Sequence, residues 1–410
     1  MSFIIWILIA IVLLFVIEHY FIRKVRSSLH ILFPKLQLST YKKIIIGVIV
    51  YINFYMILVI IAYLYSFITS GDRPVPPENT FFDYLVLFPF WLSMLIFVQC
   101  GLLYLLLDLL KLVFLPLYKK HRAKLLPIRA KIILMIAILF IIYIPIRVIY
   151  DFNTVSLRIV EFKKKNLPEA LRGFKIAFIS DIQADRYTND TRLERFISTV
   201  NSTNPDLILI AGDMITSTPN YINTSAKYVG MLKSKYGTYS CIGDHDNWAY
   251  WRDNGRSVKE ITEELKKKNV QMVDNGRKVF NVNNSEVNVA FVTNTYVEKI
   301  STATLDSLTQ LEKNYDLKIF LSHQPRNKFI DAAVKHNYDL LLAGHTHGGQ
   351  VTFLFPFYNL SATLIETKYV RGNFKFGDML MIVTRGLGMS LLPIRYNSTP
   401  EVTLITLDKK

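Results

Sequence analysis

Two histidines stand one residue apart in the stretch GHTHGGQ, which runs from Gly344 to Gln350. The apolar run LLLA comes directly before this stretch, and glycine flanks the two histidines on both sides. Glycine permits sharp backbone turns that bring short side chains together. Imidazole is a common metal ligand in proteins, so His345 and His347 are candidate ligands on one tight turn.

Acids, an amide and further imidazoles follow four other short apolar runs. The residues are Asp181 and Gln183 after KIAFIS, Asp213 after DLILIA, Asp244 and His245 after TYSCI, and His323 after KIFLS. Ligand sites in α/β sheets gather at the carboxyl ends of the strands. We therefore expect these side chains to lie together at one sheet edge.

Several carboxylates and imidazoles at one edge would repel or compete unless cations lay among them. A mixed set of oxygen and nitrogen ligands suits first-row divalent ions. Carboxylates bridge metals well, and two metals about 3.5–4 Å apart hold both oxygens of an in-line phosphoryl displacement. The residue types therefore predict a site for divalent cations, and a pair of such ions would suit phosphoryl transfer.

The elements that must position these residues alternate between strands and helices from about residue 155. The predicted strands are 175–180, 206–211, 238–242, 287–293, 318–322, 339–343, 379–384 and 401–407. Helices fit between several of them, at 190–202 and 326–336 for example. This alternation is typical of an α/β domain.

The order of these motifs resembles the calcineurin-like metallophosphoesterase superfamily, over about residues 172–408. Within it, the residues GGQ, the stretch TRGLG at 384–388 and LPIR at 392–395 resemble a bacterial membrane-associated branch. The resemblance implies a four-layer α/β/β/α sandwich. It also implies hydrolysis of a phosphate mono- or diester by a metal-bound hydroxide.

The resemblance further implies two divalent ions and a role for each residue. The implied ligands are Asp181 and His347 for the first ion, Asp213 between the ions, and Asp244, His323 and His345 for the second ion. On this reading the two neighbouring imidazoles of GHTHGGQ serve neighbouring metals. His245 would lie near the substrate, where it stabilises charge or protonates the leaving oxygen.

Two residues depart from the pattern of the superfamily. Gln183 stands where the superfamily usually has His, and it can offer a carbonyl oxygen or leave the place to water. Asp244 stands where the superfamily usually has Asn. A site richer in oxygen and less positive favours harder ions, so we expect Mn²⁺, with Mg²⁺, Fe²⁺ or Zn²⁺ as alternatives.

Two further side chains are candidate substrate contacts. Arg385 follows a predicted strand and could neutralise a phosphate, and Trp248 follows the GDHD turn and could line the substrate entrance. Core packing or the lipid interface is the alternative for Trp248. The apolar stretch 353–357 after GHTHGGQ could contact an acyl chain or form a plain hydrophobic hairpin.

The first 150 residues are predicted to be a membrane domain. Apolar residues make up 51% of the 410-residue chain, and four apolar runs lie at 3–17, 44–68, 85–107 and 132–146. The second and third runs reach the ~20 residues that a spanning helix needs. The first run spans only if Glu18 and His19 lie at the interface. We expect about four spans in 1–150 and the metallophosphoesterase domain in 151–410.

The charge pattern predicts an orientation. Residues 1–150 hold 15 Lys and Arg but only 5 Asp and Glu, and the basic segments 23–43 and 119–131 should be cytoplasmic. With four spans, the catalytic domain then faces outward, although the basic residues after the fourth run favour the opposite placement, namely Arg147, Arg158 and Lys163–Lys165. The sequence lacks a basic helix with interleaved aromatic residues, so we expect no nucleic-acid partner. The two cysteines predict no disulfide framework.

These features together predict a multi-pass membrane protein with a dinuclear-metal phosphoesterase domain. Its partners would be the bilayer and an amphiphilic substrate, such as a phospholipid or a lipid-linked phosphate or pyrophosphate. The alternative is a catalytically weak phosphate-binding or scaffold domain on a membrane anchor. Gln183 and Asp244 leave that alternative open.

Overall fold

The computed structural model describes residues 3–37, 40–69, 79–250 and 252–410. Arg73, in the loop between the second and third apolar runs, and Trp251 lie outside the described residues. The chain divides into two compact units. One comprises Met1–Val148 with Phe353–Asn359, and the other comprises Ile149–Thr352 with Leu360–Lys410.

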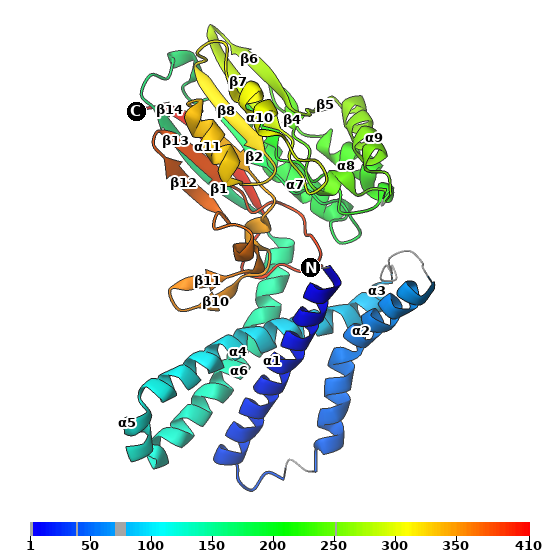
Figure 1. Cartoon of the computed structure of the whole chain (residues 1–410), viewed down its shortest axis with the longest axis vertical. Helices are drawn as coiled ribbons and strands as arrows, with labels where there is room; N and C mark the ends of the chain where they lie inside the picture. Colours follow the sequence, from blue (N-terminus) through cyan, green and yellow to red (C-terminus); the bar gives the residue numbers. More distant parts are fainter. Residues whose placement is uncertain (1–2, 38–39, 70–78, 251) are drawn as a thin grey trace. The chain divides into compact units, whose positions relative to one another are not determined.

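The first unit consists of helices and a short hairpin (Figure 1). Its elements are α1 (Phe3–Leu32), α2 (Lys42–Thr69), α3 (Thr80–Phe82), a π-helical turn (Asp83–Leu87), α4 (Phe88–Val113), α5 (Leu115–Lys120), α6 (Arg122–Asn153), β10 (Phe353–Phe355) and β11 (Tyr358–Leu360). Among the described residues, three stretches are long and apolar enough to cross a membrane: Lys42–Tyr65, Thr80–Val113 and Arg122–Asn153. They contain the third and fourth apolar runs and most of the second. The first run forms α1, and its role as a fourth span stays a prediction.

A polar pair lies between the first two long helices. Glu18 of α1 is only 4% exposed and accepts hydrogen bonds from Nδ2 of Asn53 in α2, at 2.9 and 3.1 Å. An unpaired carboxylate inside a spanning bundle is costly, so Asn53 stabilises the buried position of Glu18. The first run was expected to span only with Glu18 at the interface. Pairing with Asn53 is a second way to accommodate this carboxylate.

The hairpin of β10 and β11 packs against α4. Gln99 in α4 is fully buried; its Nε2 donates to the carbonyl of Leu354 at 2.7 Å, and its Oε1 accepts from the amide of Leu354 at 2.8 Å. One amide side chain thus satisfies the edge of β10 as a neighbouring strand would. At the turn of the hairpin, Phe357 has a φ of 67° and a fully exposed side chain.

The second unit contains two six-stranded sheets. The first sheet has the order β1 (Ser156–Lys164), β14 (Glu401–Lys409), β2 (Lys175–Ile179), β3 (Leu207–Ile210), β4 (Thr238–Ser240), β5 (Val270–Met272). The second has the order β12 (Gly372–Phe376), β13 (Met379–Val383), β9 (Leu340–Ala343), β8 (Leu317–Ser322), β7 (Ser285–Val292), β6 (Gly276–Val282). Strands β2, β3 and β4 run parallel, as do β7, β8 and β9, so each set ends at one sheet edge.

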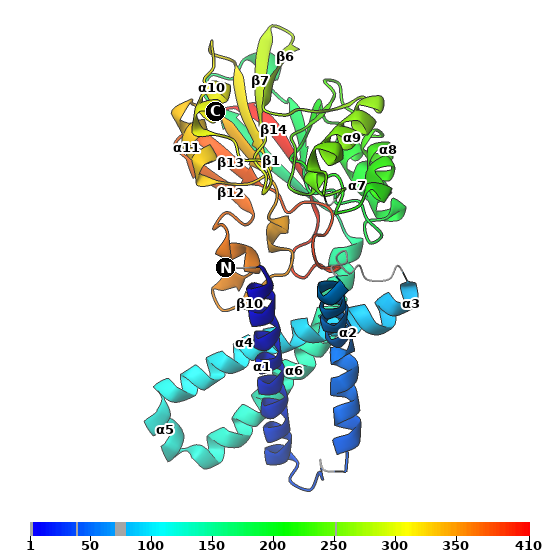
Figure 2. The same ribbon diagram turned by 45° about the vertical axis from the view of Figure 1, so that its right-hand side comes forward.

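Helices cover the outer face of each sheet (Figure 2). The first sheet packs on α7 (Asp190–Ser202), α8 (Ile222–Val229) and α9 (Asn254–Lys267), and the second packs on α10 (Thr302–Thr309) and α11 (Asn327–Lys335). A third core lies between the sheets, where Phe178 and Leu209 of one sheet join Phe291 and Leu321 of the other. The central strands are buried on both faces, which explains their continuous apolar runs. The predicted α/β/β/α sandwich is confirmed.

Candidate metal centre

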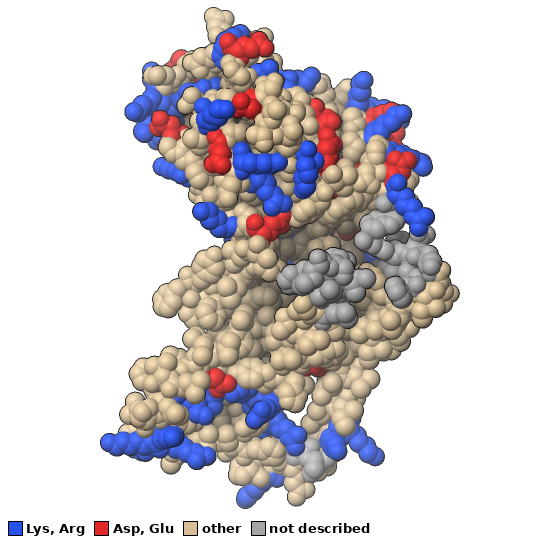
Figure 3. Space-filling model, viewed as in Figure 1, with Lys and Arg blue, Asp and Glu red and all other residues tan. Residues whose placement is uncertain are grey.

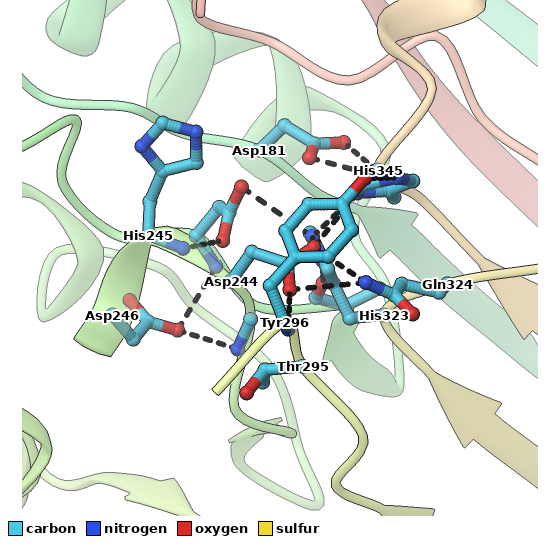
Figure 4. Close-up of polar contacts among 12 residues, drawn as sticks. Asp181, Asp244, His245, Asp246, Thr295, Tyr296, His323, Gln324 and His345 are labelled. Atoms are coloured by element: carbon cyan, nitrogen blue, oxygen red, sulfur yellow. Dashed lines mark hydrogen bonds and ion pairs between the residues drawn. The ribbon is translucent and has the colours of Figure 1, made fainter. Parts of the chain in front are cut away.

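The loops after β2, β3, β4, β8 and β9 bring the predicted residues together (Figure 4). Asp244 is central to the group, because its Oδ2 lies 2.9 Å from Nδ1 of His345 and 3.3 Å from Nε2 of His323. Nε2 of His323 lies 3.4 Å from Oδ2 of Asp213. Two groups of three residues each place their donor atoms within 4.8 Å of one another. One group is Asp244, His323 and His345, and the other is Asp181, Asp213 and His323.

Asp181 links this group to the two histidines of the GHTHGGQ stretch. Both of its carboxylate oxygens accept the backbone N–H of His345 at 3.1 Å, and its Oδ1 lies 3.6 Å from Nε2 of His347. Asp181 is fully buried, and His347 is 5% exposed. The structure therefore gathers the acids and imidazoles that follow five different strands into one buried cluster.

Strained backbone accompanies the cluster. Five of the predicted site residues have a left-handed φ, namely Asp181 (54°), Gln183 (51°), Asp213 (61°), His345 (70°) and His347 (49°). Such a conformation costs a non-glycine residue roughly 1–2 kcal/mol and persists where the surroundings enforce it. The repeated left-handed φ in these loops indicates that the backbone turns sharply after each strand and thereby presents a side chain to the cluster.

Two glycines permit the close approach of these loops. A Cβ atom on Gly243 would lie 2.2 Å from Oδ1 of Asp213, and one on Gly344 would lie 1.8 Å from the hydroxyl of Ser180. Any other residue at either position would displace the cluster or its support. The glycines in the GD and GHTH motifs therefore act by leaving room for the acids next to them.

Two imidazoles each keep one nitrogen toward the cluster. Nδ1 of His323 donates to the carbonyl of Ala211 at 2.6 Å, which leaves Nε2 facing Asp213 and Asp244. Nε2 of His345 lies 3.1 Å from Oε2 of Glu366, which leaves Nδ1 facing Asp244. An outer acceptor that fixes one nitrogen is the usual arrangement around metal-binding histidines.

Three residues that form hydrogen bonds with the cluster were not anticipated from the sequence, namely Tyr296, Gln324 and Glu366. Nε2 of Gln324 donates to both oxygens of Asp244 at 3.0 and 2.8 Å, and the amide of Tyr296 donates to Oδ1 of Asp244 at 2.6 Å. Glu366 accepts from the Tyr296 hydroxyl at 2.8 Å as well as from His345. Gln324 follows His323 directly and could have been suspected, whereas Glu366 lies in a stretch without a recognisable pattern.

Asp246, the last acid of GDHD, serves the backbone rather than the cluster. Its carboxylate accepts the amides of Gly243 at 2.7 Å, Met214 at 2.8 Å and Asp213 at 3.0 Å. These three hydrogen bonds tie the loop after β3 to the loop after β4. The position of Asp213 therefore depends on Asp246.

The charges of the cluster are balanced by protons when no cation is bound. Burial would lower the pKa of His323, but Asp213 and Asp244 raise it well above its ordinary value. Burial opposes protonation of His345 as well, yet Asp244 and Glu366 raise its pKa to about 9. Metal ions supply positive charge without protons, so this donor set fits divalent cations.

Gln183 provides a separate test of that fit. Its Nε2 donates to Oδ2 of Asp213 at 2.7 Å, while its Oε1 is buried and has no hydrogen-bond partner among the described residues. A buried carbonyl oxygen without a donor is costly. A cation beside Asp213 would satisfy this oxygen, as expected if Gln183 takes the place of the usual histidine.

His245 lies beside the cluster with its ring held on both sides. Nδ1 contacts the carbonyl of Thr216, and Nε2 lies 2.9 Å from the hydroxyl of Ser390. Burial lowers the pKa of His245 to about 4, so the ring is neutral at neutral pH. Trp248 packs its edge on this ring at 4.5 Å and stacks on Tyr296 at 6.4 Å, which places it in the wall beside His245.

Two arginines hold the chain that follows β13. Arg395 is fully buried and donates to the carbonyls of Gly388, Arg385 and Ser398 at 2.9 Å each, and its Nη2 lies 3.3 Å from Nδ1 of His347. Arg385 donates to Glu401 at 2.8 Å and to the hydroxyl of Ser156 at 2.9 Å. The guanidinium of Arg385 is therefore engaged by protein groups, and its contact with substrate stays a prediction.

Comparison with known proteins agrees with this geometry. A model of the calcineurin-like phosphoesterase family matches residues 174–349. An uncharacterised metallophosphoesterase of Bacillus subtilis, YkuE, is 31% identical over 261 residues, which cover 60% of this chain and 82% of the relative. The chain belongs to the metallophosphoesterase family. It is a metal-dependent phosphoester hydrolase, as the sequence predicted.

Two other relatives of this metallophosphoesterase add to the comparison. The phosphodiesterase YaeI of Escherichia coli is 28% identical over 261 residues, covering 62% of this chain and 88% of the relative. A transmembrane protein with metallophosphoesterase domain from Danio rerio is 28% identical over 267 residues, covering 60% of this chain but only 56% of the relative. Together with the three apolar helices, this likeness supports a membrane protein.

Proposed function

We propose that this metallophosphoesterase hydrolyses a phosphate mono- or diester of a lipid-linked substrate, with two divalent cations at the buried cluster. The observation that carries the lipid part is the hairpin of β10 and β11. It follows the GHTHGGQ stretch directly in the chain, yet it belongs to the compact unit that holds the apolar helices.

The proposed ligands divide into two sets that share one carboxylate. They are Asp181, Gln183 and His347 for the first cation, Asp213 for both, and Asp244, His323 and His345 for the second. The burial of these residues, the distances among them and the unpartnered Oε1 of Gln183 support the assignment. When bound, the cations act as Lewis acids toward phosphoryl oxygens and lower the pKa of a water molecule.

The protein groups around the cations have roles of their own in this proposal. Neutral His245 donates from Nδ1 to the carbonyl of Thr216, so its unprotonated Nε2 first takes up a proton from water and can then pass that proton to the leaving oxygen. Glu366 and the carbonyl of Ala211 hold His345 and His323 in the tautomers that ligation requires. Trp248 forms part of the substrate wall beside His245.

Chain length supports a substrate that lies in the bilayer. Phe353 follows His347 by six residues, which span at most about 20 Å when extended. The hairpin is therefore joined to the GHTHGGQ stretch by a short piece of chain. The exposed Phe357 at the turn of the hairpin provides an apolar surface for an acyl chain.

The proposed metal is Mn²⁺. Asp244 and the Gln183 carbonyl make the donor set richer in oxygen than a set with Asn and His would be, and oxygen donors favour harder ions. Metal analysis of the purified protein tests this point. Tightly held zinc together with full activity as the zinc form would count against Mn²⁺.

The proposed orientation places the catalytic unit outside the cytoplasm. It rests on the basic segments at 23–43 and 119–131, which favour the cytoplasmic side. Protease access to the C-terminal half in intact cells and in inverted membrane vesicles tests it. Cleavage in the vesicles alone would reverse the assignment.

The hydrolytic activity is tested with bis-p-nitrophenyl phosphate and added Mn²⁺. We expect turnover by the full-length protein and its loss in Asp213→Ala and His345→Ala. His336→Ala is the matched control, because the ring of His336 pairs with the surface residue Asp306 and with no other described residue. Equal activity in His345→Ala and His336→Ala would exclude this cluster as the site.

The substrate class is tested by comparing a lipid extract before and after incubation with the enzyme. We expect a phosphate-containing lipid to disappear in the presence of Mn²⁺ and to persist with Asp213→Ala. Turnover of water-soluble esters with no change in any lipid would contradict the lipid-linked substrate while leaving the hydrolase intact.

A further inference from the structure

The helical unit contains a polar pocket far along the chain from the residues of the metal cluster. Helices α1, α4 and α6 enclose a volume of about 380 Å³ there. Its charged lining residues are Arg23, Lys24, Asp108 and Arg129, and Tyr20 and Ser27 add hydroxyl groups. Charged side chains are rare between spanning helices and mark sites of ion or ligand binding.

Asp108 organises one wall of this pocket. Its carboxylate accepts from the hydroxyl of Tyr20 at 2.6 Å and from Nζ of Lys24 at 2.5 Å, and it also pairs with Nη2 of Arg129. Three donors on one carboxylate hold Lys24 and Arg129 on neighbouring helices in fixed positions. Asp108 therefore builds the pocket and is itself fully occupied.

The pocket retains positive charge after this pairing. Three Lys and Arg side chains line it against a single carboxylate. Arg23 is exposed and makes no hydrogen bond or ion pair with the described part of the chain, and the buried Nε of Arg129 lacks an acceptor there. A buried guanidinium nitrogen without an acceptor is unfavourable, and an anion in the pocket would satisfy it.

The pocket lies toward the basic end of the helical unit. Lys24 lies in the C-terminal third of α1, Asp108 lies near the end of α4, and Arg129 lies near the start of α6. Figure 3 shows Lys and Arg side chains gathered at this end of the unit, around α5. Anionic lipid headgroups concentrate at such a surface, and basic pockets between spanning helices bind them.

We propose that this pocket is a second phosphate-binding site, which takes the phosphate group of an anionic lipid or of a free anion. Guanidinium groups bind phosphate oxygens through paired N–H donors, and Arg23 and Arg129 both have donors to spare. The hydroxyl of Ser27 adds a further donor beside Arg23. The site is independent of the hydrolytic function, because none of its residues belongs to the metal cluster.

The test uses the full-length protein in nanodiscs of phosphatidylcholine, with increasing phosphatidylglycerol in one arm and inorganic phosphate in the other. Chloride at the same ionic strength controls for screening. The thermal midpoint is measured for the parent, for Arg23→Gln and for Arg26→Gln. Arg26 is the matched control, since it is exposed on the same helix but does not line the pocket.

We expect phosphatidylglycerol to raise the thermal midpoint of the parent and of Arg26→Gln. Arg23→Gln should need about fivefold more of it for the same rise, which is the effect of one cation at a lipid surface. The same pattern with inorganic phosphate alone would identify a free anion as the ligand of the same pocket.

Three results would overturn the proposal. The first is the absence of any rise with either anion. The second is an equal loss in both variants, which would indicate diffuse attraction to the basic surface. The third is an unchanged response in Arg23→Gln, which would place the anion elsewhere, for instance at the metal cluster. The midpoint in pure phosphatidylcholine shows whether each variant is folded.

Discussion

The hydroxyl of Ser390 lies 2.9 Å from Nε2 of His245, on the opposite side of the ring from the carbonyl of Thr216. A carbonyl can only accept, so Nδ1 of His245 carries the proton and Nε2 accepts from Ser390. Ser390 thereby fixes the direction of the nitrogen that we assign to proton transfer. The loop around Ser390 thus contributes to the site although it carries no proposed metal ligand.

Replacement of Ser390 by alanine should lower kcat about fivefold, the equivalent of one lost hydrogen bond of about 1 kcal/mol, with little change in KM. Ser390→Thr keeps the hydroxyl and should restore kcat. His245→Ala should cost much more, about 10²- to 10⁴-fold. Steady-state kinetics with bis-p-nitrophenyl phosphate measure all three. A Ser390→Ala enzyme with parental kcat would remove Ser390 from this role.

Replacement of Glu366 by glutamine should weaken Mn²⁺ binding by about 10- to 100-fold, because the outer partner of a metal-binding histidine tunes its affinity. Glu366 accepts from Nε2 of His345 at 3.1 Å. Titration of activity with Mn²⁺ should show a higher half-maximal concentration and a recovered maximum rate. Glu312→Gln, at a surface carboxylate that is 86% exposed, should titrate like the parent. Identical curves for the two variants would refute the role of Glu366.

Replacement of Gly243 by alanine should abolish hydrolysis and destabilise the fold by about 1–3 kcal/mol, as overpacking does. The new methyl group would lie 2.2 Å from Oδ1 of Asp213 and would push this carboxylate away. Gly255→Ala is the control, since its Cβ would meet nothing closer than 3.9 Å. Denaturant unfolding and activity are both measured. Full activity in Gly243→Ala would show that Asp213 tolerates displacement.

Replacement of Phe357 by glycine should separate lipid hydrolysis from hydrolysis of soluble esters. Phe357 is fully exposed at a φ of 67°, so glycine removes no buried surface and relieves roughly 1 kcal/mol of backbone strain. We expect an equal or higher thermal midpoint, parental turnover of bis-p-nitrophenyl phosphate and slower turnover of the lipid substrate in vesicles. Phe357→Trp keeps an aromatic ring and should retain lipid turnover. Parental lipid turnover in Phe357→Gly would exclude the hairpin from substrate contact.

Much of the sandwich could be read from the sequence because its central strands are buried on both faces. β2, β3 and β9 are short apolar runs that end in a polar residue at the site, and both signals are visible without the fold. β1 was missed because only Val160 and Phe162 are buried in it and charged residues alternate with them. Such an edge strand is stabilised by its pairing with β14. Ser156, the first residue of β1, pairs with Glu401, which lies 245 residues later in the sequence.

The same limit applies to the site. Asp181 and His345 stand in motifs, so their neighbours along the chain identify them. Glu366 and Ser390 reach the cluster from irregular loops after β11 and β13, and nothing in their local sequence distinguishes them from surface residues. Only the tertiary structure brings them within hydrogen-bonding distance of His345 and His245.

The two hydrogen bonds between Gln99 and Leu354 have a consequence for biosynthesis. Their partners are separated by 255 residues, which take a ribosome about 13–50 s to translate. During that interval helix α4 has already been made, and its Gln99 has not yet met Leu354. Completion of the helical unit is therefore delayed until nearly the whole of the downstream domain has emerged.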